Sequence, residues 1–344
     1  MAMDKSSADY YVYARASGML ARSFVGESAR KLFNAASLQE LWSLLFSEDL
    51  PQVPEILLAR QIELKAQKTF IDDYLSLVSC YEKPSPMLVA LLHFYDYDNI
   101  KEIGGALCLG EKSMPDIVDI RPFNIIDYSK WPSISAMTEG TPLAWLNAVP
   151  RLEQQKDNDY RLDCQYISEV WESIRTVSPQ CRKSLEALVG EKYRMDNIMW
   201  ALRLRTYYGM DRASVMSHLA YAGPYRSVQD VLARDAIRTL DWELDSWEQW
   251  KGWKYSMFLN PYEEGTVWSI DPRWVASAYR NAFVSRALAT FHKFPFTEAP
   301  LVCWFVIKQR ELDNIRTACE HLRLHRNSSA SISQALHIAG LEVK

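Results

Sequence analysis

The sequence predicts an all-α protein, and three observations support this fold class. Glycine accounts for only 12 of the 344 residues, about half of the ~7% that is usual in globular proteins. Aromatic residues make up 12% of the chain, and 48% of all residues are hydrophobic. Apolar residues recur at steps of three and four along most of the chain, which is the spacing of one helix face. Scarce glycine and many large apolar side chains are typical of long helices rather than of loop-rich β proteins.

The periodicity gives the expected elements in chain order. It favours helices over 8–46, 55–80, 87–109, 161–178, 182–208, 211–222, 227–258, 274–292, 298–324 and 328–339. Residues 110–160 contain five prolines and are expected to form turns and short helices. Pro224 interrupts the helical pattern, and residues 259–273 are expected to form a loop. At roughly 150 residues per domain, a chain of this length accommodates two or three domains.

Composition argues against several classes of function. The formal net charge is −4, so no basic face for a nucleic acid is indicated. The six cysteines are scattered, without a Cys-x-x-Cys pair, which indicates free thiols rather than a zinc knuckle. No apolar run approaches the ~18 residues that would span a bilayer, and the first residues do not resemble a signal peptide. Association with a membrane is therefore expected to pass through a partner protein.

An internal repeat is the most informative feature of the sequence. The tripeptide Asp-Asn-Ile occurs at 98–100, 196–198 and 313–315, and the last two copies continue to match at a constant offset of 117 residues. These spacings exceed the ~34–47 residues of TPR or HEAT units. They suggest three small helical domains of one ancestral type, which we place at 1–119, 120–223 and 224–344.

Each Asp-Asn-Ile triplet is expected to lie inside a helix. In the third copy Ile315 would face the core, and Asp313 would lie on the opposite side, within reach of Arg310 or Arg316. Asparagine is neutral to unfavourable inside helices because its amide competes with the backbone. Its presence in all three copies therefore implies a specific hydrogen bond, for example to a neighbouring helix. Two interpretations stay open: a structural contact between helices, or a polar ring that faces a partner.

Three segments carry a likeness to a known family. The first is YYVYARASGMLARSFV (10–25), with Tyr11 and Arg15. The second is EKYRMDNIMWALRLRTYYG (191–209), with Asp196, Asn197 and Arg203. The third is PFTEAPLVCWFVIKQRELDNIRTACEHL (295–322), with Lys308, Glu311, Asn314, Ile315 and Arg316. In order and spacing they resemble the signatures of the C subunit of the bacterial and archaeal V/A-type rotary ATPases (ATP synthases), whose eukaryotic V-ATPase homologue is named d.

This resemblance covers most of the chain, with two departures. Gly104 and Gly105 stand where an arginine-bearing helix is typical of the family, and residues 242–274 are unusually rich in tryptophan. The resemblance implies three pseudo-equivalent helical domains, arranged as a funnel with pseudo-threefold symmetry. It also implies a peripheral position at the cytoplasmic face of the membrane, reached through the ATPase complex.

The function that the resemblance implies is that of a non-catalytic component of the central stalk. It would couple the rotating shaft, made of the D and F subunits, to the membrane rotor ring of c/K subunits, for ATP-linked transport of protons or sodium ions. No catalytic residue, cofactor or metal is implied. The polar positions of the repeats would hold the domains together or contact a partner: Asp98, Asn99, Asp196, Asn197, Arg203, Glu311, Asp313, Asn314 and Arg316.

Other motifs are weaker. Residues 105–113 nearly match a phosphate-binding loop, but Glu111 stands where lysine is required and no strand is expected before it. His321 and His325 share one helix face, but a zinc site needs a third ligand and a metalloprotease needs Glu where Leu322 stands. We therefore expect these histidines at a solvated helix end.

The tryptophans at 242, 247, 250 and 253 lie on one predicted helix. We expect them in a domain core, with a partner interface or a membrane-surface belt as alternatives. Two alternative functions also stay open. One is an unrelated all-helical scaffold or adaptor protein, and the other is an enzyme with a site around His321 and Glu320.

Overall fold

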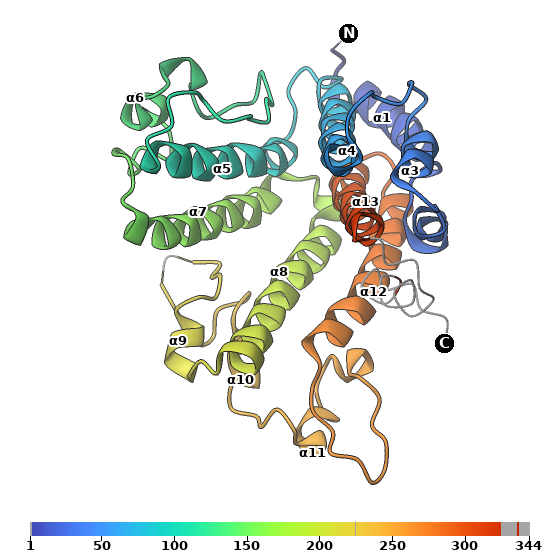
Figure 1. Cartoon of the computed structure of the whole chain (residues 1–344), viewed down its shortest axis with the longest axis vertical. Helices are drawn as coiled ribbons and strands as arrows, with labels where there is room; N and C mark the ends of the chain where they lie inside the picture. Colours follow the sequence, from blue (N-terminus) through green and yellow to red (C-terminus); the bar gives the residue numbers. More distant parts are fainter. Residues whose placement is uncertain (1, 224, 325–335, 337–344) are drawn as a thin grey trace.

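The computed structural model describes residues 2–223, 225–324 and 336, and its regular structure is helical (Figure 1). Within these residues thirteen α-helices and four short 3-10 helices follow one another. Extended backbone pairs there only in one isolated bridge between Met3 and Tyr81. The prediction of an all-α fold is confirmed. The predicted helix at 328–339 lies outside the described residues, except for Leu336.

The first third of the described chain begins with short helices and continues into a long one. Helices α1 (Lys5–Leu20), α2 (Arg30–Phe33) and α3 (Leu38–Leu45) precede α4 (Glu55–Val78). Side chains cap two of them: the Asp4 carboxylate accepts from the N–H of residue 7, and the Ser37 hydroxyl accepts from that of residue 40. Such caps satisfy N–H groups that have no partner within the helix. The predictions for 8–46 and 55–80 agree with these helices.

Helices α5 (Pro86–Cys108) and α7 (Leu152–Ser173) lie side by side. Between them the chain forms turns and the short α6 (Ile134–Thr138), which packs on α5 in a small hydrophobic cluster. The prediction of turns and short helices over 110–160 holds only to residue 151, because α7 begins nine residues before residue 161. The first turns of α7 read LEQQKDNDY and carry no apolar periodicity that could have marked a helix.

Prolines stand at the start of the remaining long helices. Helices α8 (Pro179–Tyr208), α12 (Pro272–Lys293) and α13 (Ala299–Arg323) each have proline at the first or second helical position, as α5 does. The missing N–H costs nothing there, because the first turn has no acceptor within the helix. Helix α8 ends at Gly209 with φ of 59°, a left-handed conformation that glycine adopts without steric cost. Helix α9 (Arg212–Met216) follows.

The prediction of one helix over 227–258 is wrong. This segment contains α10 (Arg234–Thr239), α11 (Trp247–Trp250) and a single 3-10 turn, joined by irregular backbone. The rings of Trp242 and Trp250 meet edge-on with centroids 5.0 Å apart, and Trp250 Nε1 donates to the Glu243 carbonyl oxygen at 2.7 Å. Apolar residues with the spacing of a helix therefore form an aromatic core here although the backbone is not a continuous helix. Packing of the rings and hydrogen bonds in the turns stabilise this backbone in place of helical hydrogen bonds.

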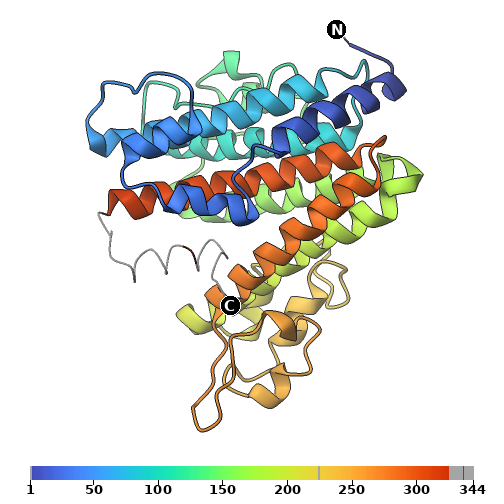
Figure 2. The same cartoon turned by 90° about the vertical axis from the view of Figure 1, so that its right-hand side faces the viewer.

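The Trp-rich segment forms an aromatic extension of the core. Trp250, Trp253 and Trp268 are buried, in agreement with the core interpretation. Ring contacts continue from Trp253 through residues 255 and 258 to Tyr279 of α12. Figures 1 and 2 place this segment at the end of the molecule farthest from the N-terminus.

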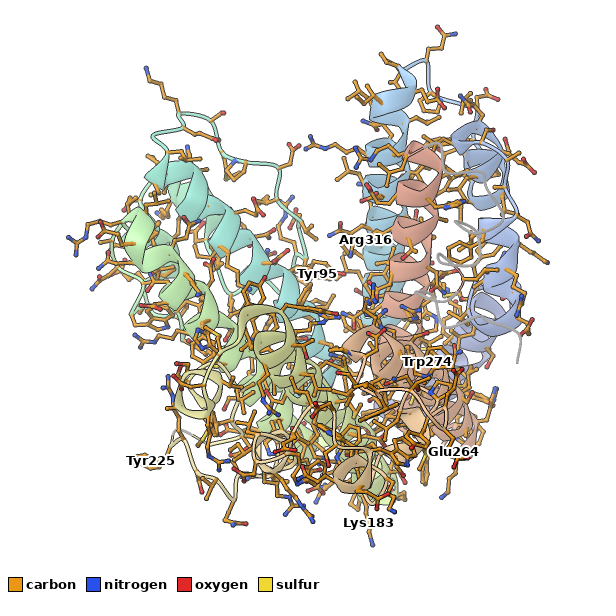
Figure 3. All side chains as sticks on the ribbon, turned by 60° about the horizontal axis from the view of Figure 1, so that its bottom comes forward. Tyr95, Lys183, Tyr225, Glu264, Trp274 and Arg316 are labelled. Atoms are coloured by element: carbon orange, nitrogen blue, oxygen red, sulfur yellow. The ribbon has the colours of Figure 1, made fainter. Side chains whose placement is uncertain are left out.

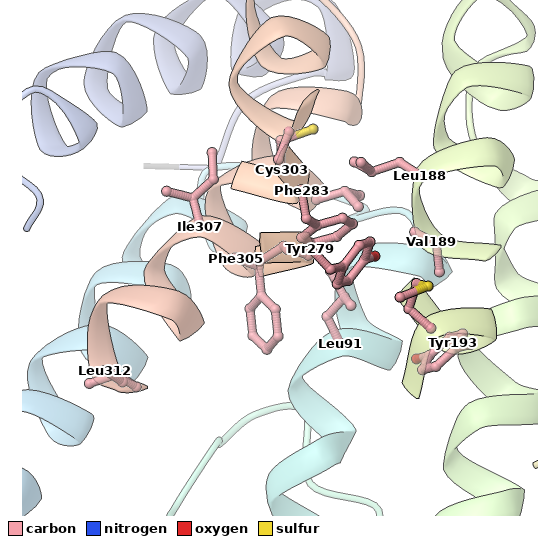
Figure 4. Close-up of a cluster of buried hydrophobic side chains, with 14 of the residues drawn as sticks. Leu91, Leu188, Val189, Tyr193, Tyr279, Phe283, Cys303, Phe305, Ile307 and Leu312 are labelled. Atoms are coloured by element: carbon pink, nitrogen blue, oxygen red, sulfur yellow. The ribbon is translucent and has the colours of Figure 1, made fainter. Parts of the chain in front are cut away.

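One large hydrophobic core joins the long helices (Figure 4). Leu91 of α5, Tyr193 of α8, Tyr279 of α12 and Phe305 of α13 meet there. From this core the helices diverge as three pairs, which we call arms: α5 with α7, α8 with α12, and α13 with α4. In each arm one helix carries an Asp-Asn-Ile triplet, so the three arms are built alike.

Candidate functional site

The three Asp-Asn-Ile triplets present the same pattern of exposure on α5, α8 and α13. In every copy the aspartate is exposed, whereas the isoleucine is buried and the asparagine is 5%, 4% or 2% exposed. Successive helical residues point about 100° apart, so a buried anchor and an exposed charge stand next to each other in the sequence but face different surroundings. The repeated triplet therefore combines two separable roles.

The first two asparagines bind the backbone of the loop that follows their own helix. Asn99 Nδ2 donates to the Val118 carbonyl oxygen at 2.7 Å, and the Val118 N–H donates back to Asn99 Oδ1 at 2.9 Å. Asn197 Nδ2 donates to the Ala220 carbonyl oxygen at 2.8 Å, and the Ala220 N–H donates to Asn197 Oδ1 at 2.8 Å. Each amide thus satisfies both polar groups of one backbone residue, which buried backbone requires.

The third asparagine makes an equivalent contact with a different part of the chain. Asn314 Nδ2 donates to the Phe24 carbonyl oxygen at 3.0 Å. The Phe24 N–H donates to Glu311 Oε1 at 2.6 Å, so Glu311 supplies the acceptor that Asn99 and Asn197 supply themselves. Phe24 follows α1, near the start of the chain. The sequence suggested a neighbouring helix as the partner, but the contact that all three copies share is with the backbone of a loop. Asn99 Nδ2 donates in addition to the Tyr128 hydroxyl at 2.7 Å.

The exposed aspartates face cations on their own helices. Lys192 Nζ lies 2.8 Å from Asp196 Oδ2, and guanidinium nitrogens of Arg310 and Arg316 lie 3.8 and 3.9 Å from the Asp313 carboxylate. Burial alone would lower the pKa of Lys192, but Asp196 and, at longer range, Asp313 raise it above the usual lysine value. Because Asp313 belongs to another arm, this interaction crosses from α8 to α13.

A second interaction crosses between α5 and α13. Burial raises the pKa of Asp98, while Lys101 and Arg316 act in the opposite direction. Figure 3 shows Tyr95 of α5 and Arg316 of α13 on facing sides of the space between their arms. Charged groups of the three triplets therefore lie within electrostatic reach of a neighbouring arm. We call the region between the three arms the common interior.

Arginines from three helices gather beside Asp196 and Asp313. Burial and the neighbouring Arg280 of α12 lower the pKa of Arg310 to about 10. Burial also lowers the pKa of Arg280, which lies within electrostatic reach of Arg203 and of both aspartates. A cluster of charged groups with shifted pKa values at an accessible surface marks a candidate binding site.

A cavity of about 820 Å³ lies between α7 and α8 at the edge of this interior. Phe94, Tyr166 and Trp200 contribute aromatic surface to its lining, and the Trp200 side chain is 44% exposed. A second cavity of about 970 Å³ adjoins it and shares Tyr160 with it. The second cavity is lined mostly by polar and charged residues. The first combines apolar surface with a few polar groups, and a partner's side chains commonly anchor in hollows of that kind.

The glycine pair that departs from the family signature has a packing role. A Cβ atom at Gly104 would lie 3.3 Å from Pro150 Cγ, and one at Gly105 would lie 2.8 Å from Gln155 Nε2. The absence of side chains therefore lets the start of α7 approach α5 closely. Since α5 continues to Cys108, the first residues of 105–113 are helical and do not form a phosphate-binding loop.

His321 is buried rather than solvated, contrary to the expectation from sequence. Its side chain is 8% exposed and burial lowers its pKa, because α13 packs against α2, α3 and α4. His325 lies outside the described residues. In the part of the chain that the structure describes, no group of three His, Cys, Asp or Glu side chains is placed to hold a metal ion.

Sequence reasoning selected the triplets, Arg203, Glu311 and Arg316, but missed other charged residues of the interior. Lys192 could have been found from its i,i+4 spacing to Asp196. Arg280 carried no such signal, because it lies on α12 and meets the triplets only in the folded chain.

Comparison with known proteins supports the assignment that the sequence signatures suggested. A model of the family described as ATP synthase (C/AC39) subunit matches residues 12–329. An uncharacterized protein of Treponema pallidum (strain Nichols) is 31% identical over 320 residues, which are 93% of this chain and 94% of that relative. None of the helices in the described ranges has the length and hydropathy needed to cross a bilayer. The predicted resemblance is confirmed, and an unrelated scaffold is set aside: the chain belongs to the ATP synthase (C/AC39) subunit family.

Proposed function

We propose that this chain is a non-catalytic component of the central stalk of a rotary V/A-type ATPase. It seats the rotating shaft, made of the D and F subunits, on the membrane rotor ring of c/K subunits, at the cytoplasmic face of the membrane. The observation that carries this proposal is the common interior, bordered by three similar arms and lined by the exposed aspartates of the repeat. In this proposal the interior receives the end of the shaft, and the hydrophobic core that the long helices share couples the three arms mechanically.

The pairing of the long helices supports three interlocked domains at 1–119, 120–223 and 224–344. Each proposed domain contains one Asp-Asn-Ile helix: α5, α8 or α13. Each of these helices pairs with a helix of another domain: α5 with α7 of the second, α8 with α12 of the third, and α13 with α4 of the first. This cyclic order is what a funnel with pseudo-threefold symmetry requires, because every domain then makes the same kind of contact with the next.

The nine polar positions of the repeat divide into two proposed roles. The buried ones, Asn99, Asn197 and Asn314 together with Glu311, hold loop segments in place through the hydrogen bonds described above. The charged ones that border the interior contact the shaft: Asp98, Asp196, Arg203, Asp313 and Arg316. Of the two interpretations of the asparagines, we therefore favour the structural one.

Affinity purification tests the proposal. Membranes of the source cells are solubilised gently, and the complex is isolated through a tag on this chain. We expect the D and F subunits and the c/K ring to be recovered with it, and the same set to be recovered when the tag is placed on the shaft instead. Deletion of the chain should uncouple ATP hydrolysis from ion transport. Recovery of the chain alone, together with unchanged coupling in the deletion strain, would refute the proposal.

A further inference from the structure

One side of the common interior carries excess positive charge. Lys192, Arg280, Arg310 and Arg316 lie around Asp196 and Asp313 on α8, α12 and α13, and Arg203 of α8 lies within electrostatic reach of Arg280. We call this set the basic wall. Five cations accompany two carboxylates, which leaves an excess of three positive charges.

The opposite side carries excess negative charge. Asp98, Glu102, Asp159 and Asp163 lie together on α5 and α7, accompanied by Lys101 and Lys156. We call this set the acidic wall. Burial raises the pKa of Asp159; Lys101 opposes this shift, and the other three carboxylates add to it. Lys101 Nζ lies 2.5 Å from Asp163 Oδ1, yet four carboxylates against two lysines leave an excess of two negative charges.

The two walls meet at the cavity between α7 and α8. Asp159 and Asp163 of the acidic wall line it from α7, and Lys192 of the basic wall lines it from α8. Aromatic side chains, including Phe94 and Trp200, lie between them. A protein segment that fills this cavity therefore touches both walls and an apolar surface at once.

We infer that the interior accepts its occupant in one orientation, with acidic side chains of the occupant against the basic wall and basic side chains against the acidic wall. This inference rests on the proposed function, in which the occupant is the foot of the shaft made by the D and F subunits. Three similar arms would by shape alone accept a foot in three orientations. The charges distinguish these orientations, because like charges brought together across an interface are strongly unfavourable and complementary charges fix the register.

Charge reversal on one wall tests the inference. Binding of purified D–F shaft to the whole chain is measured at low and at high NaCl concentration. Arg203→Glu should raise Kd at least about tenfold at low salt and much less at high salt, because salt screens charges at an accessible surface. Lys183→Glu is the matched control: it makes the same charge change on the same helix, but its exposed side chain points outward (Figure 3). Its Kd should stay within about twofold of the wild-type value.

A second variant keeps the inference testable if Arg203→Glu fails to fold. Asp159→Lys reverses a charge on the opposite wall and should also raise Kd about tenfold at low salt. If Arg203→Glu and Asp159→Lys both bind as Lys183→Glu does, the inference is overturned while the proposed function stands, since the wild-type chain still binds the shaft. If the wild-type chain binds no shaft at either salt concentration, the proposed function and the inference both fail.

Crosslinking tests the single orientation directly. Leu152 borders the cavity on α7 and its side chain is 72% exposed, so a photocrosslinking residue placed there should reach the bound foot. We expect attachment to one stretch of the shaft. Comparable yields on stretches from three different sides of the foot would show that the occupant binds in three orientations, and would overturn the inference.

Discussion

Replacing Asn197 by leucine tests whether the repeated asparagine stabilises the fold or contacts a partner. Asn197 Nδ2 donates to the carbonyl oxygens of Ala220 at 2.8 Å and Leu232 at 3.0 Å, and Asn197 Oδ1 accepts from the Ala220 N–H at 2.8 Å. The side chain is buried, so water does not replace these bonds when leucine, a residue of similar size, takes its place. The variant leaves three backbone groups of the following loop without a partner.

The expected loss of stability follows from these three bonds. A buried polar group without a partner costs about 1–3 kcal/mol, and some relaxation of the loop reduces the sum. We expect the free energy of unfolding to fall by about 3–5 kcal/mol. An unfolding entropy of ~2.1 cal/mol/K per residue gives roughly 0.7 kcal/mol/K for this chain, so Tm should fall by about 4–7 °C for cooperative unfolding.

Calorimetry of the isolated protein measures this shift, and the neighbouring residue provides the control. Asp196→Leu removes a partly exposed ion pair with Lys192 worth about 0.2–1 kcal/mol, so its Tm should change by no more than about 1.5 °C. Below its Tm, Asn197→Leu should bind the shaft with an affinity near that of wild type, because its side chain is buried and does not contact the shaft. An Asn197→Leu variant with unchanged Tm and lost shaft binding would refute the structural role of the asparagine.

Three further predictions concern other contacts of the fold. Burial raises the pKa of Glu298, but hydrogen bonds, chiefly from the Ser178 N–H, lower it below the ordinary 4.5. The ionised Glu298 carboxylate therefore stabilises the fold at pH values above its pKa in the unfolded chain, and this stabilisation is lost as pH falls through its lower pKa in the folded chain. The urea midpoints of wild type and Glu298→Gln should accordingly converge as pH falls below ~4.5. Glu311→Leu removes the acceptor of the Phe24 N–H, so hydrogen exchange of that amide should accelerate at least about tenfold; unchanged exchange would contradict this. Trp250→Phe removes a part-buried hydrogen bond and leaves part of a filled volume empty, so the free energy of unfolding measured in urea should fall by about 2–3 kcal/mol; a fall below about 0.5 kcal/mol would contradict this prediction.

The helices could be predicted where local signals agree. Pro86, Pro179 and Pro272 start helices at positions where a missing N–H costs nothing, and the apolar stripes behind them give the 3.6-residue period. The start of α7 lacks such a stripe because its first turns are polar. The Trp-rich segment has helical spacing without a helix, because the rings find their contacts across turns. Periodicity records which side chains are buried, and several backbone paths can bury the same side chains.

The candidate site could be predicted only in part, for a related reason. Because asparagine is unfavourable inside helices, the sequence indicated that Asn99, Asn197 and Asn314 each make a specific hydrogen bond. The partners lie in loops, and Phe24 lies 290 residues from Asn314 along the chain, so no local pattern could identify them. The charged walls depend on which helices face each other, which is decided by packing of the shared core.

The third copy of the repeat explains how the start of the chain is tied to its last long helix. In the first two copies the asparagine binds a loop residue that lies 19 or 23 residues after the asparagine itself. In the third copy, Asn314 and Glu311 bind Phe24, in the segment after α1. The buried Glu298 strengthens the same connection, since Lys5 Nζ lies 3.0 Å from its carboxylate. Three arms linked only in chain order would leave the first and last free to separate, so a load on one arm would bend the molecule. Contacts of α5 with α13, of α7 with α8 and of α12 with α13 join the three arms to one another. Each arm is therefore held by both of its neighbours, and the proposed function, transmission of torque, calls for such stiffness.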